Sequence, residues 1–169
     1  MKRPVYTIGH GNRKIDDFIA LLKTYGIKYL VDVRSKPYSA YNPQFIRENL
    51  EAALEENNIV YVYMGDALGG RPSNPGCYTN GRVDYNKVKE MTFYKNGIER
   101  LKTAYAKDIS LAIMCAESNP CSCHRSKLIS ATLTEVNITV MHIDEKGKLK
   151  THEKVMKEIN LPGNSLFTA

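Results

Sequence analysis

The densest group of reactive side chains lies between residues 115 and 125. It contains Cys115, Glu117, Cys121, Cys123, His124 and Arg125. We expect this segment to join a strand to a helix. A cation and the backbone amides at a helix N-terminus favour the thiolate, which is the nucleophilic form of cysteine. We therefore predict that Cys115 or Cys123 is a nucleophile and that Glu117 or His124 carries protons.

Two other interpretations of these cysteines remain open. Cys115 could be a small core residue that ends a strand, since free cysteines are commonly buried. The set Cys115, Cys121, Cys123 and His124 could instead hold a structural metal ion. Its spacing differs from the usual zinc patterns, and the adjacent Cys123 and His124 cannot easily turn toward one ion. We therefore assign no metal ligand and keep the metal-binding loop as an alternative.

Three further groups of residues suit a ligand site. His10 follows a short predicted strand between two glycines, and we expect it to be a catalytic residue that moves protons. Arg34 follows a second strand, and its guanidinium suits a phosphate or carboxylate; Asp32, buried just before it, needs a polar partner. Paired glycines in a long loop allow close backbone approach to a ligand. The predicted anion-binding residues are Arg34, Arg125, Gly69, Gly70 and Arg71.

Strands and helices alternate along the chain. Short apolar runs predict strands at 5–8, 29–33, 59–63, 109–114 and 138–143. Apolar residues at helical spacing predict a helix that ends at Gly26 and further helices at 45–56, 86–105, 123–133 and 148–160. We expect the helix at 86–105 to be broken near Gly97. Residues 67–84 are expected to be irregular. This order predicts a single α/β domain with a mostly parallel sheet of about five strands and helices on both faces.

The predicted fold also says where the chemistry should occur. In open α/β sheets, ligands bind outside the carboxyl ends of the strands. His10, Arg34 and Cys115 each follow or end a predicted strand, so we expect them to meet at one edge of the sheet. The first two strands, joined through a helix, are expected to form a parallel pair.

Length and composition limit the class of protein. The chain has 169 residues, which we assign to one domain over 1–160 and a tail over 161–169. Its 24 Lys and Arg against 18 Asp and Glu give a net charge of +6, which suits an anionic small molecule or nucleic acid. No apolar run is long enough to span a membrane and no signal-peptide core is present, so we expect a cytoplasmic protein. Cofactor and oligomeric state stay open.

Four segments together resemble a known family. They are Thr7-Ile8-Gly9-His10, Leu30-Val31-Asp32-Val33-Arg34-Ser35, Leu68-Gly69-Gly70, and Met114-Cys115-Ala116-Glu117 with Cys123-His124-Arg125. In this order they are similar to the family called domain of unknown function 488, over about residues 5–145. The resemblance implies a shared fold and polar site but no reaction. A fainter likeness to rhodanese-type sulfurtransferases differs in the cysteine loop, because here the arginine lies ten residues beyond Cys115.

These observations favour a small cytosolic enzyme that binds an anionic substrate and carries out thiol-dependent transfer or hydrolysis. The first alternative is a non-catalytic nucleic-acid or nucleotide-binding module, which the net charge of +6 and the tyrosines would suit. The second is the loop with a structural metal ion.

Overall fold

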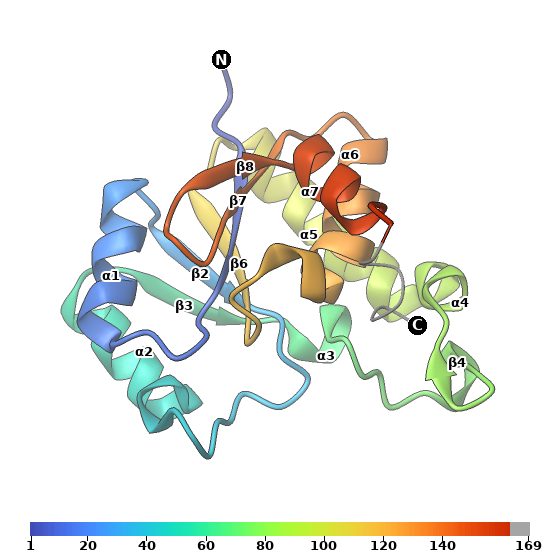
Figure 1. Ribbon diagram of the computed structural model, residues 1–169, viewed down its shortest axis with the longest axis horizontal. Coiled ribbons are helices and arrows are strands. Elements are labelled where there is room, and N and C mark those ends of the chain that lie inside the picture. The colour runs from blue at the N-terminus through green and yellow to red at the C-terminus, as the bar shows by residue number, and fades with distance from the viewer. Residues whose placement is uncertain (163–169) are drawn as a thin grey trace.

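A six-stranded sheet forms the centre of the protein (Figure 1). The computed structural model describes residues 1–162. The strands are β1 (Val5–Gly9), β2 (Tyr29–Asp32), β3 (Val60–Tyr63), β6 (Leu111–Cys115), β7 (Val140–Ile143) and β8 (Leu149–Thr151). Their order across the sheet is β3-β2-β6-β1-β7-β8, and every neighbouring pair is parallel except β7 and β8. The predicted α/β fold with a mostly parallel sheet is confirmed.

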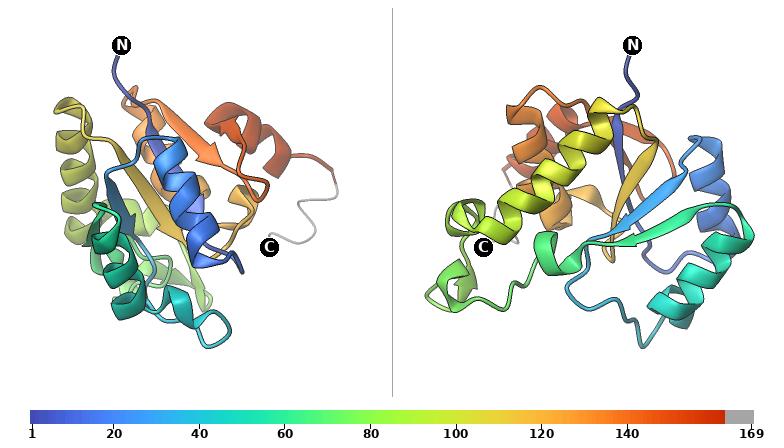
Figure 2. Two further views of the ribbon diagram at one scale, coloured as in Figure 1. Left: turned by 90° about the vertical axis from the view of Figure 1, so that its left-hand side faces the viewer. Right: turned by 180° about the vertical axis from the view of Figure 1, so that it is seen from behind.

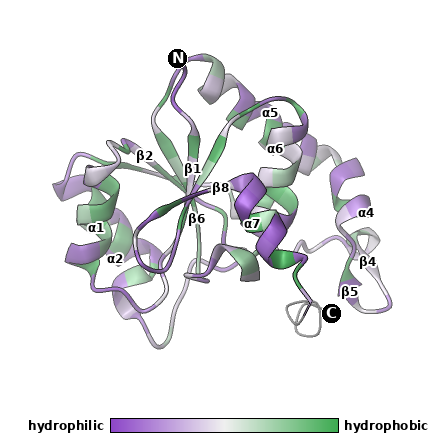
Figure 3. Cartoon of the chain, turned by 45° about the horizontal axis from the view of Figure 1, so that its top comes forward, coloured by the Kyte–Doolittle hydropathy of each residue, from purple (hydrophilic) through white to green (hydrophobic). Residues whose placement is uncertain are grey.

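Helices cover both faces of the sheet (Figures 1 and 2). One face packs against α1 (Ile15–Thr24) and α2 (Arg47–Glu56). The opposite face packs against α3 (Gly65–Leu68), α5 (Thr92–Ala106) and α6 (Ala131–Glu135). The last helix, α7 (His152–Ile159), contacts β7 and β8. Hydrophobic residues follow the central strands, whereas hydrophilic residues are prominent on α7 (Figure 3).

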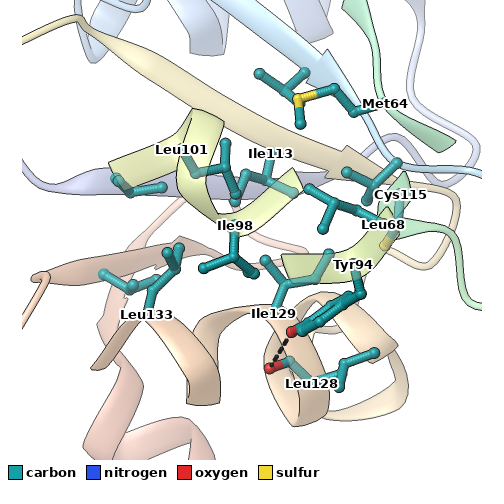
Figure 4. Close-up of a cluster of buried hydrophobic side chains, with 14 of the residues drawn as sticks. Met64, Leu68, Tyr94, Ile98, Leu101, Ile113, Cys115, Leu128, Ile129 and Leu133 are labelled. Atoms are coloured by element: carbon teal, nitrogen blue, oxygen red, sulfur yellow. Dashed lines mark hydrogen bonds between the residues drawn. The ribbon is translucent and has the colours of Figure 1, made fainter. Parts of the chain in front are cut away.

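Two apolar cores form because successive side chains of a strand point to opposite faces. The α1-side core includes Ile8, Phe18, Leu22, Leu30, Phe45 and Met114. The α5-side core includes Val31, Leu68, Tyr94, Ile113, Cys115 and Cys123. Along β6, Ala112 and Met114 therefore face α1, whereas Ile113 and Cys115 face α5. Figure 4 shows Cys115 beside Leu68 at one end of the α5-side core.

The sheet differs from the sequence-based prediction in two respects. It has a sixth strand, because Leu149–Thr151 pairs antiparallel with β7 where we expected the start of a helix. In addition, β1 and β2 are parallel but do not pair with each other, because β6 lies between them. The insertion places the carboxyl end of β6, and with it Cys115, between the ends of β1 and β2.

The segment after β3 contains more regular structure than its turn-rich sequence predicts. It begins with the single turn of α3 and continues through a small hairpin of β4 (Tyr78–Thr79) and β5 (Arg82–Val83) into α4 (Tyr85–Glu90). The break in the following helix falls at Met91, not near Gly97 as expected. Gly97 lies inside α5, where an added Cβ would be only 2.8 Å from a methyl carbon of Leu68, so glycine there lets α3 and α5 approach closely.

The helix expected over 123–133 is also different. Residues Arg125–Ser130 form a π-helical turn that continues directly into α6. The hydroxyl of Ser130 donates to the carbonyl oxygen of Arg125 at 2.6 Å, which ties the ends of this wide turn together. Such turns are uncommon and are frequent at functional sites.

Other features of the sequence agree with the structure. Gly26 ends α1 with φ +66, as its predicted capping role requires. In the described part of the chain, no helix is long and apolar enough to cross a membrane. The predicted tail, 161–169, lies almost wholly outside the described residues.

Candidate functional site

Cys115 lies at the carboxyl end of the central strand β6, and its sulfur is buried. Its Sγ accepts a hydrogen bond from Nη1 of Arg125 at 2.7 Å and lies 3.6 Å from the carbonyl oxygen of Glu117. The residue is only 1% exposed, yet its partner is the fully buried guanidinium of Arg125. Cys115 is therefore part of a polar site as well as a core residue.

Arg125 is completely buried at the first position of the π-helical turn. Besides Cys115, its guanidinium donates to the carbonyl oxygens of Glu117 at 2.6 Å and Ser118 at 3.3 Å. Within residues 1–162, no carboxylate forms an ion pair with it, and its Nε has no hydrogen-bond partner. Burial alone would lower the pKa of Arg125, but the sulfurs of Cys115 and Cys123 raise it by more, so the pKa lies above its ordinary value and the guanidinium stays charged.

Cys123 places a second buried sulfur beside the first. The backbone N–H of Arg125 donates to its Sγ at 3.4 Å. The two sulfurs and a carboxylate oxygen of Glu117 all lie within 4.8 Å of one another. Burial raises the pKa of Cys123 well above its ordinary value, and the hydrogen bond and negative charge of Cys115 raise it further. Cys123 is therefore held in its protonated form.

Glu117 extends over the two sulfurs from the exposed loop after β6. Burial of its carboxyl raises the pKa, but hydrogen bonds from its own backbone N–H and from the thiols of Cys115 and Cys123 lower it overall. Glu117 is thus a carboxylate that accepts hydrogen bonds from both thiols.

His124 is held in one tautomer. Its Nε2 lies 3.0 Å from the carbonyl oxygen of Leu68, and because a carbonyl only accepts, Nε2 carries the proton. The unprotonated Nδ1 lies 3.6 Å from Sγ of Cys123. Burial lowers the pKa of His124, so the ring is neutral at neutral pH. His124 consequently presents a free lone pair to the Cys123 thiol.

The predicted residues on the first two strands form a second polar group. Nη1 of Arg34 donates to the carbonyl oxygen of Phe45 at 2.8 Å, while its Nε and Nη2 donate to the two carboxylate oxygens of Asp32 at 2.9 and 2.7 Å. Tyr61 also donates to Asp32, at 2.7 Å. The predicted partners of Asp32 are therefore present, and the charge of Arg34 is neutralised by Asp32 in this structure.

His10 belongs to this second group. Its ring stacks on Phe45 with centroids 4.4 Å apart, and Nδ1 donates to the carbonyl oxygen of Gly11 at 2.8 Å. Nε2 faces Nη1 of Arg34 at 3.4 Å. Burial lowers the pKa of His10 to about 4, so it is neutral at neutral pH.

The two polar groups share one edge of the sheet but lie on opposite faces. Gly9 of β1 is in register with Cys115 of β6, so His10 points to the face opposite Cys115. The backbones still touch, since the N–H of His10 donates to the carbonyl oxygen of Cys115 at 3.0 Å. The structure thus brings Cys115, Glu117, Cys123, His124 and Arg125 together, and sets His10 and Arg34 beside them across the sheet.

The family described as "Domain of unknown function DUF488" matches residues 14–132. This chain belongs to the DUF488 family. The matched range contains Arg34, Gly69, Gly70 and the whole cysteine loop, whereas His10 lies just before it. No curated protein and no solved structure matches the chain.

The paired glycines of this DUF488 protein pack against the thiol group. A Cβ on Gly70 would lie 2.9 Å from Nδ1 of His124, and one on Gly69 would lie 2.4 Å from the hydroxyl of Ser35. Arg71 follows them with an exposed side chain, and its backbone N–H donates to the same hydroxyl at 2.9 Å. The glycines therefore allow the long loop to approach the imidazole, and Arg71 is an exposed cation next to that contact.

One residue of the DUF488 site was missed by the sequence analysis. Tyr85 begins α4 and packs against the α5-side core. Burial raises the pKa of its phenol, and the nearby negative charges of Cys123 and Glu117 raise it further. Tyr85 falls between the segment expected to be irregular, 67–84, and the helix expected from residue 86, so no local signal marks it as part of the site. The N-cap residue Asp84, which accepts from two backbone amides of α4, is the feature that positions it.

Cys121, by contrast, lies away from the other two thiols of the loop. Its Sγ is 3.9 Å from the carbonyl oxygen of Val155 and 3.5 Å from a carboxylate oxygen of Glu158, both on α7. The metal-ligand candidates that the structure groups together are Cys115, Glu117 and Cys123. The ligand set considered from spacing alone therefore changes: Glu117 is added, whereas Cys121, which faces α7, and His124 are not in the group.

Proposed function

We propose that this DUF488 protein is an enzyme that uses Cys115 as a nucleophile in thiol-dependent transfer or hydrolysis. The observation that carries the proposal is the contact of 2.7 Å between Nη1 of Arg125 and the Cys115 sulfur. A fully buried guanidinium needs a negative partner, and no carboxylate in residues 1–162 forms an ion pair with it. A thiolate at Cys115 supplies that charge.

Each neighbouring group has a role in this chemistry. Glu117 lies within reach of both sulfurs and accepts the proton that Cys115 gives up. Arg125 then stabilises the thiolate, which attacks an electrophilic centre of the substrate and displaces a leaving group. Cys123 keeps its proton during this attack, and the departing group takes its proton from Glu117 or from solvent. Because reactive thiols persist in reducing compartments, we propose that the enzyme is cytoplasmic.

We further propose that the substrate is anionic. Arg71 supports this part best, because its side chain is exposed and its backbone lies beside the contact between Gly70 and His124. Of the other predicted anion-binding residues, Gly69 and Gly70 precede Arg71 in the same loop, and Arg125, which follows His124 in the sequence, is fully buried. Arg34 forms an ion pair with Asp32, so it would bind the anionic substrate only after that pair rearranged.

Two alkylating reagents test both parts of the proposal. Iodoacetate and iodoacetamide modify thiolates at the same atom, but only iodoacetate carries a negative charge. We expect Cys115 to be alkylated faster than Cys121 at neutral pH. We also expect the ratio of the iodoacetate rate to the iodoacetamide rate to be higher at Cys115 than at Cys121. Peptide mass analysis assigns the modified residue.

Variants make this test specific. Cys115→Ser should remove the fast alkylation, and Arg71→Gln should lower the rate ratio while leaving the iodoacetamide rate close to that of the unmodified protein. Cys121→Ser serves as the matched control, because its thiol lies in the same loop but contacts α7. A Cys115 that is no more reactive than Cys121 refutes the nucleophile. A rate ratio below that of Cys121 refutes the anionic substrate.

The grouping of two sulfurs and one carboxylate within 4.8 Å favours a second candidate, a bound metal ion. Two thiolates and a carboxylate suit zinc. The guanidinium that donates to Cys115 argues against it, because it competes with a cation for the same sulfur. Elemental analysis of protein purified without chelators decides: stoichiometric zinc lost in Cys123→Ser supports the metal site. The nucleic-acid-binding alternative rests on the net charge of +6 and the tyrosines of the sequence.

A further inference from the structure

We propose that Cys115 and Cys123 act as a nucleophilic and a resolving thiol that pass through an internal disulfide, and that the substrate presents an electrophilic sulfur, such as that of a disulfide. The inference rests on the proposed function, because Cys115 must first be the nucleophile. It goes further by naming the atom attacked and by giving Cys123 a chemical step of its own.

The first observation is the proximity of the two sulfurs. Sγ of Cys115 and Sγ of Cys123 lie within 4.8 Å of each other, and both are buried in the α5-side core. A disulfide requires about 2.0 Å between sulfurs. Cys123 belongs to the loop between β6 and the π-helical turn, where its backbone is extended, with φ −129 and ψ 147. Rotation of its side chain and a small shift of this loop would close the gap without moving a strand.

The second observation is that each sulfur has its own proton acceptor. The carboxylate of Glu117 reaches Cys115, whereas the free Nδ1 of His124 lies 3.6 Å from Cys123. The carbonyl oxygen of Leu68 fixes the imidazole in the tautomer that leaves this nitrogen unprotonated. A base beside the second thiol has no use if Cys115 alone reacts, but it is needed if Cys123 reacts afterwards.

The third observation explains the order of the two steps. Arg125 contacts both sulfurs, through Nη1 to Cys115 and through its backbone N–H to Cys123. While Cys115 is a thiolate, its charge and hydrogen bond raise the pKa of Cys123. When Cys115 forms a mixed disulfide, that charge disappears and the positive charge of Arg125 remains. The second thiol then loses its proton more readily than before.

The chemistry balances in two steps. The Cys115 thiolate attacks one sulfur of a disulfide R–S–S–R, so that the R–S–S–R bond breaks, a mixed disulfide forms, and one RS⁻ leaves and takes a proton from solvent. Cys123 then gives its proton to His124 and attacks the Cys115 sulfur. The second RS⁻ leaves with that proton. The substrate gains two electrons, the protein loses two, and an external dithiol restores the reduced pair.

The experiment uses 5,5′-dithiobis(2-nitrobenzoic acid), an anionic aromatic disulfide that releases a coloured thiolate. We use the full chain with Cys121→Ser, so that the partly exposed thiol does not contribute. Colour release and intact mass are followed together. We expect a fast and then a slower release, and a final protein that carries no adduct but contains a Cys115–Cys123 disulfide on peptide mapping.

Two variants make the outcome decisive. Cys123→Ser, which keeps an acceptor for the N–H of Arg125, should release the first thiolate only and retain the adduct on Cys115. Cys77→Ser removes a buried thiol of the same core and should behave like its parent. If the parent keeps the adduct as long as Cys123→Ser does, the resolving step is refuted. If Cys115 reacts with neither this disulfide nor iodoacetamide, the proposed function fails as well.

Discussion

The carbonyl oxygen of Glu117 occupies the space in which any residue other than glycine at position 9 would carry its Cβ. An ideal Cβ built on Gly9 lies 1.7 Å from that oxygen and 2.6 Å from Nη1 of Arg125. The loop after β6 therefore crosses the end of β1 in direct backbone contact. The same carbonyl oxygen accepts from Arg125 at 2.6 Å, so this crossing helps to hold the guanidinium against Cys115.

Gly9→Ala should therefore damage the thiol site directly. Either the loop moves away or β1 shifts, and overpacking of this kind costs about 1–3 kcal/mol of the free energy of unfolding. We expect the alkylation rate of Cys115 to fall by about tenfold, because Arg125 loses its position. Gly26→Ala is the control: its positive φ makes it destabilising too, but no atom lies within 4 Å and the thiol rate should not change. Urea denaturation and alkylation kinetics measure both effects.

Arg125→Met should lower stability and reactivity together. The variant keeps much of the side-chain volume but leaves the carbonyl oxygens of Glu117 and Ser118 without their donor, and we expect a loss of about 2–4 kcal/mol in the free energy of unfolding. The alkylation rate of Cys115 at neutral pH should fall by at least tenfold. Arg125→Lys should recover part of that rate because it restores the charge. Equal rates in the methionine and lysine variants would contradict the electrostatic role.

Gly70→Ala should act on the resolving step through His124. The added methyl would lie 2.9 Å from Nδ1, so the ring must rotate or shift away from Cys123. We expect the second release of thiolate from the aromatic disulfide to slow by about tenfold, and the first release to change much less. His124→Asn should likewise slow the second release of thiolate more than the first. A variant in which the first release slows more than the second would show that this contact serves Cys115 instead.

Asp32→Asn should destabilise the protein strongly. The substitution leaves the guanidinium of Arg34, which is 5% exposed, without its anionic partner. Breaking a buried ion pair in this way costs about 3–5 kcal/mol. Tyr61→Phe removes one neutral donor to the same carboxylate and should cost only about 1 kcal/mol. Chemical denaturation of the two variants compares them, and similar losses in both would contradict a structural ion pair.

Stability should fall as the pH drops below 6.5. Burial lowers the pKa of His10 to about 4 and, in the core near β8, that of His142 to about 3. Between these values and 6.5 the unfolded chain binds protons that the folded protein does not. The free energy of unfolding therefore decreases on acidification, by up to about 1.4 kcal/mol per pH unit for each histidine.

His142→Gln tests this assignment without touching the thiol site. The variant lacks one of the four histidines whose pKa is lowered by burial, and its amide can still pair with the hydroxyl of Thr7. We expect a shallower loss of stability between pH 6.5 and about 4 than in the parent, measured by urea denaturation across that range. An unchanged slope would show that other groups cause the acid sensitivity.

Much of this architecture follows from local sequence. Short apolar runs that alternate with helical periodicity predict the α/β fold with helices on both faces, and the structure confirms it. The family was recognisable from four short motifs, and the match over residues 14–132 confirms that prediction. Gly26 can be predicted to end α1 from local sequence, because glycine readily adopts the positive φ that this position requires.

The composition of the site depended on long-range pairing. From sequence, His10, Arg34 and Cys115 were all expected at one edge, but the insertion of β6 between β1 and β2 decided which residues face each other. The pleat then put Cys115 on the α5 side and His10 on the α1 side. Strand order and register arise from packing between segments about a hundred residues apart, so no local pattern contains them.

Charge compensation was likewise decided by the tertiary structure. By itself, the sequence established that the cysteine loop holds three thiols, a carboxylate, an imidazole and a guanidinium. Only the fold places Arg125 against Cys115, directs Cys121 toward α7, and pairs Arg34 with Asp32. The physical reason is burial: away from water each charge needs a specific partner, and which partners are within reach is settled when the sheet and its helices pack.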